Sequence, residues 1–467
     1  MPIRRESATD VQFVLTAIRR DSNEVLKNSE GLSDLSDFVV TANITESINS
    51  AGIQGEINIQ DSANLIASLR GDELWRLQYS TAQGDIVHQL QCYSIENRTR
   101  QNNTDLYTIK LCSAEFMNNE VSNLFGSSKI IFKKGDRSHD IVEQILRGKT
   151  QGFMNTVKRV FVEEGDNAHE FVACNWRWFD TIYWIAQRTV RKSGGKNSDP
   201  QNGFLFWENY LGYHFQSIDK MIDDVNDQDY DDKTDKKSGK AKLYRYVYDI
   251  KKAGQEVEDS YKINTVKYVS DRNILQGLRN GTWAGYSSAF DPTITPNSQL
   301  TVDTPNAAGP YAYSMNDLWN KMSHLGSQGN KSNPYNKYAD AIREILETPR
   351  RIKYSFLPNR IHDGNTDADG EADNKLYEQL PYLEAYQYMR VQALKNIQLL
   401  VVVPGNVDLY AGKGVDIQIP SPKTKNGKVI MDQKYSGRYL ISAVRHKFDG
   451  RQLYTEMLLY KDALVQK

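Results

Sequence analysis

The sequence is poor in cysteine, with only Cys92, Cys112 and Cys174 among 467 residues. Their number is odd and no two form a CxxC pair, which argues against a disulfide framework and against a zinc ribbon. We therefore expect reduced thiols and folding in a cytosol. Long apolar runs are also missing, because the longest aliphatic stretch, Leu399–Val403, is far too short for a membrane-spanning segment. No apolar segment follows the first basic residues, so no secretory signal is expected.

Net charge is nearly absent as well, since 58 basic and 59 acidic residues leave a balance of −1. Proteins that bind nucleic acid over their whole surface are usually basic, so no sequence-specific nucleic-acid partner is expected. Aromatic residues with a polar group are abundant instead, with 27 Tyr and 7 Trp. Such residues are frequent at protein interfaces and in β-rich cores.

Motifs of catalysis are missing too. The sequence has no GxGxxG, GxxxxGK[ST], HExxH or GxSxG. The turn Gly412-Lys413-Gly414 is not a phosphate-binding loop, because no Ser or Thr follows the lysine. The seven histidines are scattered, and adjacent residues such as His169-Glu170 would point to opposite faces of a strand. No catalytic residue, cofactor or metal is therefore expected, and the chain is predicted not to be an enzyme, although a carboxylate pair for glycoside hydrolysis could still meet in the fold.

Two acidic segments stand out. Eight Asp lie within 219–235, and we interpret 219–240 as a solvated loop or linker. Residues 363–373 resemble a calcium-binding EF-hand loop that starts at Asn365, but its twelfth position, Leu376, lacks the required carboxylate. A solvated acidic turn explains this segment as well, so calcium binding at 363–373 stays open.

Hydrophobic periodicity predicts strands and helices along the whole chain. Alternating runs at 37–48, 56–60, 73–80, 86–96 and 106–113 are typical of an antiparallel barrel or sandwich. Further strands are predicted at 204–208, 212–215, 243–248, 261–269, 398–403, 414–419, 439–446 and 453–460. Helical spacing appears at 114–124, 138–146, 175–186, 271–278, 315–325, 337–347 and 376–396. Extended loops are predicted at 291–312 and 359–374.

Two distant stretches of the sequence are alike. Gly71–Leu77 precedes Leu106-Tyr107-Thr108, and Gly414–Ile419 precedes Leu453-Tyr454-Thr455, with a long predicted hairpin before each Leu-Tyr-Thr. The hairpin turns lie near Asn102-Asn103 and at Asp449-Gly450. Either an internal duplication or the common chemistry of strands explains this likeness.

The predicted class is β-rich α+β, with two related antiparallel β-barrel domains and an interrupted α/β module between them. The order along the chain is a first barrel (1–118), the first part of the module (119–240), the first strands of the second barrel (241–275), the rest of the module with a long insert (276–396), and the last strands of the second barrel (397–467). The roles of the insert 282–395 and of the Asp-rich loop are left open.

The C-terminal residues carry the most specific pattern. It consists of Val403-Pro404-Gly405-Asn406, Ala411-Gly412-Lys413-Gly414-Val415, Tyr435-Ser436-Gly437-Arg438-Tyr439 and His446. This pattern resembles the last barrel of the central baseplate hub protein of contractile-tailed bacteriophages, a family shared with phage-like injection systems. The resemblance implies two related barrels per chain and a homotrimer, so that six barrels form a pseudo-sixfold ring.

The resemblance also implies partners and a location. The partners would be the central spike protein, the tail tube or tube-initiator protein, other baseplate proteins and the tape-measure protein. The chain would be a structural component of the virion, in the tail baseplate, assembled in the host cytoplasm. We expect the two hairpin tips to contact neighbouring rings: Arg100, Gln101, Asn102 and Asn103 in the first barrel, and Asp449, Gly450 and Arg451 in the second. His446 is interpreted as structural or interfacial. The alternatives are a tail-associated cell-wall hydrolase and a glycan-binding tail component.

Overall fold

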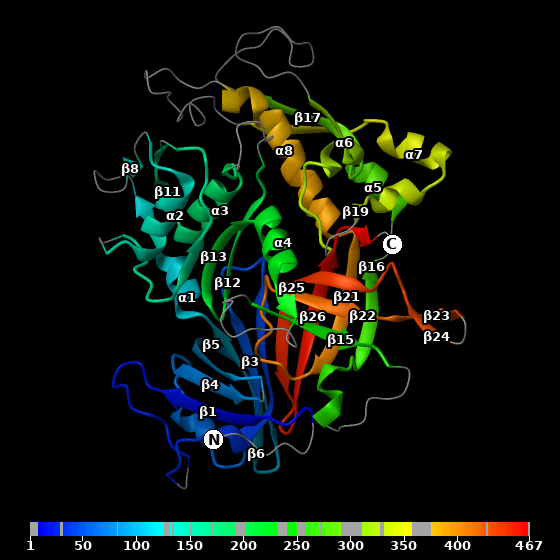
Figure 1. Cartoon of the computed structure of the whole chain (residues 1–467). Coiled ribbons are helices and arrows are strands. Elements are labelled where there is room, and N and C mark those ends of the chain that lie inside the picture. The colour runs from blue at the N-terminus through cyan, green and yellow to red at the C-terminus, as the bar shows by residue number, and fades with distance from the viewer. Residues whose placement is uncertain are drawn as a thin grey trace.

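In the computed structural model, one 13-stranded sheet runs through the molecule, flanked by helices and smaller sheets (Figure 1). The structure describes residues 8–28, 31–81, 83–125, 131–132, 135–149, 152–169, 171–192, 201–230, 241–249, 257–270, 273–290, 311–326, 331–356, 375–425 and 428–465. Nearly all strand pairs in the large sheet are antiparallel, which confirms the predicted β-rich α+β class.

The first six strands of the chain form one part of the large sheet, here called the N-terminal unit. They are β1 (Gln12–Ile18), β2 (Val39–Ser47), β3 (Gln54–Asp61), β4 (Leu74–Ser80), β5 (Asp85–Gln101) and β6 (Thr104–Cys112). Their side chains alternate between buried and exposed, so that Leu15, Ile57, Trp75 and Ile109 meet in one apolar core. The predicted strands between 37 and 113 are confirmed, whereas β1 was not predicted.

Six later strands form the C-terminal unit. They are β15 (Lys242–Val247), β16 (Thr265–Ser270), β21 (Ile397–Pro404), β22 (Gly414–Gln418), β25 (Gly437–Phe448) and β26 (Leu453–Lys461). When the strands of each unit are numbered in chain order, both units have the neighbours 1-4-5-6-3-2. One pairing differs in direction, because β1 is antiparallel to β4 whereas β15 is parallel to β22. The two units are thus a structural repeat.

The register of the repeat is set by a β-bulge that both units share. It lies between Cys92 and Ser94 in β5, and between Ile441 and Ala443 in β25. When these bulges are aligned, Ile109 corresponds to Met457 and Leu111 to Leu459, and all four lie in the apolar cores. The two Leu-Tyr-Thr stretches are therefore one residue out of register, since Leu106 corresponds to Tyr454. A shift of one residue would turn every side chain to the opposite face.

Strand β2 joins the two units into one sheet. It pairs antiparallel with β25, from Ala42 opposite Phe448 to Ser47 opposite Ala443. On the same edge of β25, the preceding segment Gly437–Leu440 pairs with β22. Within the described ranges, no strand pair closes either unit into a barrel.

The α/β part packs around an aromatic core of its own. Helices α1 (Ala114–Val121), α2 (Ser138–Arg147) and α3 (Trp178–Ala186) contribute to this core together with the hairpin β12 (Phe204–Asn209) and β13 (Gly212–Ser217). Strand β9 (Val160–Val162) extends the hairpin, and the short strands β7 (Leu124–Phe125), β8 (Ile131–Phe132), β10 (Phe171–Val172) and β11 (Cys174–Trp176) form two small pairs. The helix predicted over 175–186 therefore begins later, because residues 174–176 pair with β7.

The Asp-rich run begins as a helix, which corrects the prediction of a solvated loop over 219–240. Helix α4 (Ile218–Asp227) is capped by Ser217, whose Oγ accepts a hydrogen bond from the Lys220 N–H. Its buried apolar residues recur at helical spacing: Ile218, Met221, Ile222 and Val225. Strand β14 (Asp229–Tyr230) then pairs with β15, and residues 231–240 lie outside the described ranges.

The insert between the segments of the C-terminal unit forms a cap at the top of Figure 1. It holds α5 (Ile274–Asn280), β17 (Ala284–Phe290), β18 (Tyr311–Ser314), α6 (Met315–Trp319), α7 (Asp340–Glu347), β20 (Ile352–Phe356) and α8 (Lys375–Leu394). Helix α5 ends as predicted at Gly281, whose φ is 67°. The sheet β18-β17-β20 was not predicted, and α6 ends six residues before the predicted 325.

Four short strands complete the fold. They are β19 (Lys331–Ser332), which pairs with β27 (Leu464–Val465), and β23 (Pro420–Lys425), which pairs with β24 (Lys428–Met431). The calcium-like stretch 363–373 and most of the loop predicted over 291–312 lie outside the described residues.

Candidate assembly interface

The residues predicted to contact partners lie at two exposed hairpin tips. Arg100–Asn103 connect β5 to β6, Asp449–Arg451 connect β25 to β26, and all seven residues are exposed. In the aligned register, the pair Arg100–Asp105 corresponds to the pair Phe448–Leu453, so the tips are equivalent parts of the two units. The second tip lies beside the N-terminal segment, where the Leu453 N–H donates to the Thr9 carbonyl.

Both tips are held by contacts of their own. Arg98 Nη2 lies 2.9 Å and Arg100 Nε 2.7 Å from the carboxylate of Asp105, and these hydrogen bonds lower the pKa of Asp105 to about 2. In the second tip, Asp449 Oδ1 accepts hydrogen bonds from the N–H groups of Arg451 and Gln452. Two polar loops of defined shape are therefore available to a partner.

The strand pair that joins the two units contains a buried carboxylate. Glu46 of β2 accepts hydrogen bonds from the Tyr210 N–H at 2.8 Å and from the Ala411 N–H at 3.3 Å. It thereby links the N-terminal unit to the β12–β13 turn and to the C-terminal unit. Burial raises the pKa of Glu46 to about 8, although the two backbone donors favour the charged form.

A second polar cluster ties the N-terminal unit to the α/β part. Lys158 Nζ lies 2.5 Å from Glu208 Oε1 and 2.6 Å from Glu115 Oε2. Glu208 Oε2 in turn accepts a hydrogen bond from the Ile53 N–H at 3.3 Å. Burial opposes the charge on Lys158, but the two carboxylates outweigh it and raise the pKa of this lysine. The cluster fixes the module against the sheet.

A buried polar network joins the insert to the rest of the molecule. Arg390 of α8 has no exposed side-chain surface, and its Nε lies 3.1 Å from Asp219 Oδ1. Its Nη1 donates to Asp462 Oδ2 at 3.2 Å, and its Nη2 donates to the Ser323 carbonyl at 2.6 Å. Burial alone would lower the pKa of Arg390, but Asp219 and Asp462 more than offset this effect and raise it.

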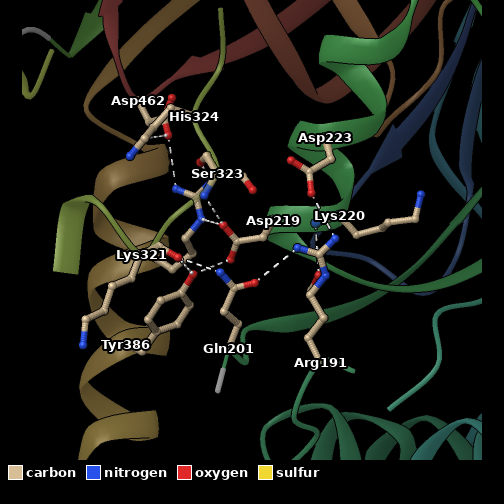
Figure 2. A network of polar contacts seen from close by, with 12 residues as sticks. Arg191, Gln201, Asp219, Lys220, Asp223, Lys321, Ser323, His324, Tyr386 and Asp462 are labelled. Carbon is tan, nitrogen blue, oxygen red and sulfur yellow. Dashed lines mark hydrogen bonds and ion pairs between the residues drawn. The ribbon is translucent and has the colours of Figure 1, made fainter. Parts of the chain in front are cut away.

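The two carboxylates of this network are fully bonded. Figure 2 shows Tyr386 and Ser323 directed toward Asp219, which accepts from the Tyr386 hydroxyl at 2.8 Å and from the Ser323 N–H at 2.7 Å. Asp462 lies 2.9 Å from His324 Nδ1, while His324 Nε2 faces the Trp319 carbonyl at 2.7 Å. Both ring nitrogens of His324 therefore face oxygen atoms of the network.

Sequence reasoning missed this network, because it assigned Asp219 to a solvated loop. Figure 2 also shows its continuation, in which Arg191 Nη2 contacts Asp223 at 3.0 Å and Arg191 Nη1 contacts Gln201 at 3.2 Å. The usable signal was the apolar spacing within the run 218–225, which predicts a helix with one buried face.

The histidines of the described region lie mostly in structural roles. Ser138 Oγ lies 2.8 Å from His169 Nε2, but both residues are fully buried, so this pair is closed to a substrate. His446 is buried between Thr455 Oγ1 and the Leu409 carbonyl, and burial lowers its pKa to about 4. His446 is therefore structural.

Among the described residues, no three His, Cys, Asp or Glu side chains are grouped to hold a metal. The helices that the structure describes include none long and apolar enough to cross a membrane.

Comparison with known proteins identifies solved structures that share this fold. No protein-family model and no curated protein matches the sequence. A solved structure described as the tail protein from Neisseria meningitidis MC58 matches with a TM-score of 0.51 and 9% identity, over 96% of this chain and 97% of that one. The 43 kDa tail protein of prophage MuSo2 from Shewanella oneidensis matches with a TM-score of 0.50 and 7% identity, over 97% and 98%. The resemblance found in the sequence is thus confirmed at the level of the fold: over nearly its whole length, this chain shares the fold of these two tail proteins.

Proposed function

We propose that the chain is a structural protein of a phage or phage-like tail, a trimeric baseplate hub that joins a threefold spike to a sixfold tube. The observation that carries this proposal is the repeat of six strands in the order 1-4-5-6-3-2 within one chain. Three chains with two equivalent units each present six similar surfaces, which can match a sixfold partner while the other side stays threefold.

The two units correspond to the two related barrels of the proposal. Each unit has its own apolar core, with Trp75 and Leu77 in the first and Val415 and Ile417 in the second. Phe448 and Leu453 of the C-terminal unit also pack into the first core. The proposed division assigns 1–118 to the first barrel, 241–275 and 397–467 to the second, and 119–240 and 276–396 to the α/β module.

The proposed partners follow from the symmetry. The tube or tube-initiator protein would dock on the hairpin tips, where Arg100–Asn103 and Asp449–Arg451 supply equivalent contacts. The spike would bind the threefold side. Other baseplate proteins and the tape-measure protein would be further binding partners. The chain would then be part of the virion baseplate, assembled in the host cytoplasm.

Electron microscopy of the assembled particle tests the proposal. We expect threefold density that fits this fold between a sixfold tube and a narrow spike. A single copy away from the tail axis would overturn it. The tail-hydrolase alternative is tested by turbidity clearing of peptidoglycan with the purified chain, and clearing that one carboxylate substitution abolishes would replace the adaptor. Glycan binding by the isolated monomer would favour the glycan-binding alternative.

A further inference from the structure

Strand β25 is covered along one edge by two strands in succession. β22 pairs with Gly437–Leu440, and β2 pairs with Ala443–Phe448. In the N-terminal unit, β4 pairs with Asp85–Gln91 of β5, which is the equivalent first segment. The second segment, Ser94–Arg100, pairs with β6 on its other edge, and no described strand covers the edge that corresponds to the β2 junction.

Strand β16 is the counterpart of β2 in the repeat. β2 pairs with the third strand of its unit, β3, and β16 pairs with the third strand of its own unit, β21. β2 uses its second edge for the junction with β25, whereas β16 pairs with β21 alone among the described strands. Lys267 is exposed and Val269 is 48% exposed on this strand. A strand edge of this kind is a template for pairing with another chain.

We propose that β16 of one chain pairs antiparallel with the Ser94–Arg100 edge of β5 in a second copy of this chain. The junction that β2 and β25 make within each chain would then be repeated between chains. The occupant is a second copy because the equivalent edges of the repeat, those of β2 and β25, already pair with each other inside the chain. This inference rests on the proposed trimer and adds the strands that meet.

The contact is head-to-tail, because the two edges that no described strand covers belong to different units of one chain. Junctions within and between chains would alternate around the assembly. If each turns the sheet by the same angle, three chains close a ring of six units and leave no free edge of this kind. Closure also explains how exposed strand edges are protected from open-ended pairing.

The junction within the chain predicts the register between chains. Asn43 lies opposite Lys447 in the β2–β25 pair. When the registers are aligned through the partner strands, Lys267 takes the place of Asn43 and Thr99 takes the place of Lys447. This alignment takes account of a second bulge in β5, between Glu96 and Thr99, that β25 lacks. Lys267 of one chain is therefore expected opposite Thr99 of the next, and both residues are exposed.

A paired-cysteine experiment on the full chain tests this register. Residues directly opposite in antiparallel strands have Cα atoms about 4.5–5.5 Å apart, which a disulfide can bridge. The variant Thr99→Cys plus Lys267→Cys should give a covalent trimer under mild oxidation that reduction converts back to the single chain. The matched control is Thr99→Cys plus Lys423→Cys, since Lys423 is an exposed lysine on β23, outside both edges.

Native mass spectrometry and electrophoresis then separate the outcomes. A trimer that forms but does not cross-link, or that cross-links equally well in the control, overturns the strand pairing and leaves the proposed hub standing. A chain that stays monomeric and uncross-linked also overturns the pairing. A specific covalent trimer from a chain that proves to be absent from the tail axis supports the pairing and overturns the hub.

Discussion

Asp219 of α4 and Arg390 of α8 form an ion pair of 3.1 Å in which neither side chain has exposed surface. The two helices come from different halves of the α/β material, and Asp462 after β26 completes the contact. A buried ion pair of this kind contributes little net stability, because removing two charges from water offsets their attraction. We expect its effect to lie in specificity, since each charge must find its partner before the insert can dock.

Removing the cation should therefore be strongly destabilising. Arg390→Met keeps most of the side-chain volume but leaves Asp219 and Asp462 buried without their guanidinium. We expect a loss of about 3–5 kcal/mol in the free energy of unfolding, the usual effect of breaking a buried pair from one side. Urea unfolding followed by tryptophan fluorescence measures it.

The matched control is Arg445→Met, because Arg445 is 52% exposed and lies 3.7 Å from Glu456. Exposed pairs contribute about 0–1 kcal/mol, so this variant should remain close to the unmodified chain. Equal losses at Arg390 and Arg445 would show that the buried network does not hold the insert in place.

The buried carboxylate of Glu46 predicts a pH dependence of stability. Burial raises its pKa from 4.5 to about 8, so the folded chain binds more protons at this site than the unfolded chain between these values. The contribution of Glu46 to stability is therefore largest below pH 4.5 and falls as the pH rises to about 8. The loss is at most about 1.4 kcal/mol per pH unit.

Glu46→Gln should flatten this dependence, because the amide does not titrate. It also gives up one acceptor for the Tyr210 and Ala411 N–H groups, so we expect a constant loss of about 1–2 kcal/mol at low pH. Unfolding titrations at several pH values measure both effects. Glu120→Gln, at a carboxylate that is 55% exposed, should leave the profile as it is. An unchanged slope in Glu46→Gln would mean that Glu46 is charged in the fold.

Local sequence patterns predicted most strands of the large sheet, because one buried face imposes alternation on each strand. Trp75 and Leu77 in β4 show this, and so do Val401 and Val403 in β21. The same alternation is present in β1, where Phe13, Leu15 and Ala17 are buried, although no strand was predicted there. The Asp-rich composition of 219–235 concealed the helical spacing of α4, since polar residues outnumber the buried ones there.

Contacts between distant segments could not be read from those patterns. The partners of Asp219 lie on α8 and after β26, and no local rule connects these segments. The sequence also could not give the register of the repeat, because Leu106 and Leu453 match in sequence but lie on opposite faces of their strands. Only the shared bulges at Cys92 and Ile441 reveal the correct alignment.

The lysine of the Gly412-Lys413-Gly414 turn gives a further prediction. Lys413 is almost fully buried, and its Nζ donates to the Asp408 carbonyl at 2.7 Å and to Asp408 Oδ2 at 2.8 Å. It also lies over the rings of Tyr244 and Tyr410. We expect Lys413→Met to lose about 2 kcal/mol, less than for a fully enclosed pair because Asp408 remains partly exposed to water. Lys423→Met, at an exposed lysine, is the control, and an equal effect of both would contradict this role.

The hairpin tips give the prediction that bears most directly on the proposed docking. Arg451 and Gln101 occupy the two equivalent tips, and both are exposed. They are better targets than Asp449, whose carboxylate holds its own turn through the N–H groups of Arg451 and Gln452. Arg451→Glu plus Gln101→Glu should therefore change the free energy of unfolding by no more than about 0.5 kcal/mol.

The same double variant should weaken attachment to the tail tube, because it reverses or adds charge at every unit of the proposed ring. We expect the affinity of the hub for the tube to fall on the order of tenfold for each altered tip. Co-sedimentation of the hub with purified tubes at fixed salt measures this loss. Lys423→Glu makes a comparable charge change on the exposed hairpin of β23 and β24 and should leave attachment intact. If the tip variant binds tubes as well as the control does, the tips are not the docking surface. Arg451→Glu changes the charge of its tip by two units and Gln101→Glu by one, so the first substitution alone should show the larger part of the loss in free energy.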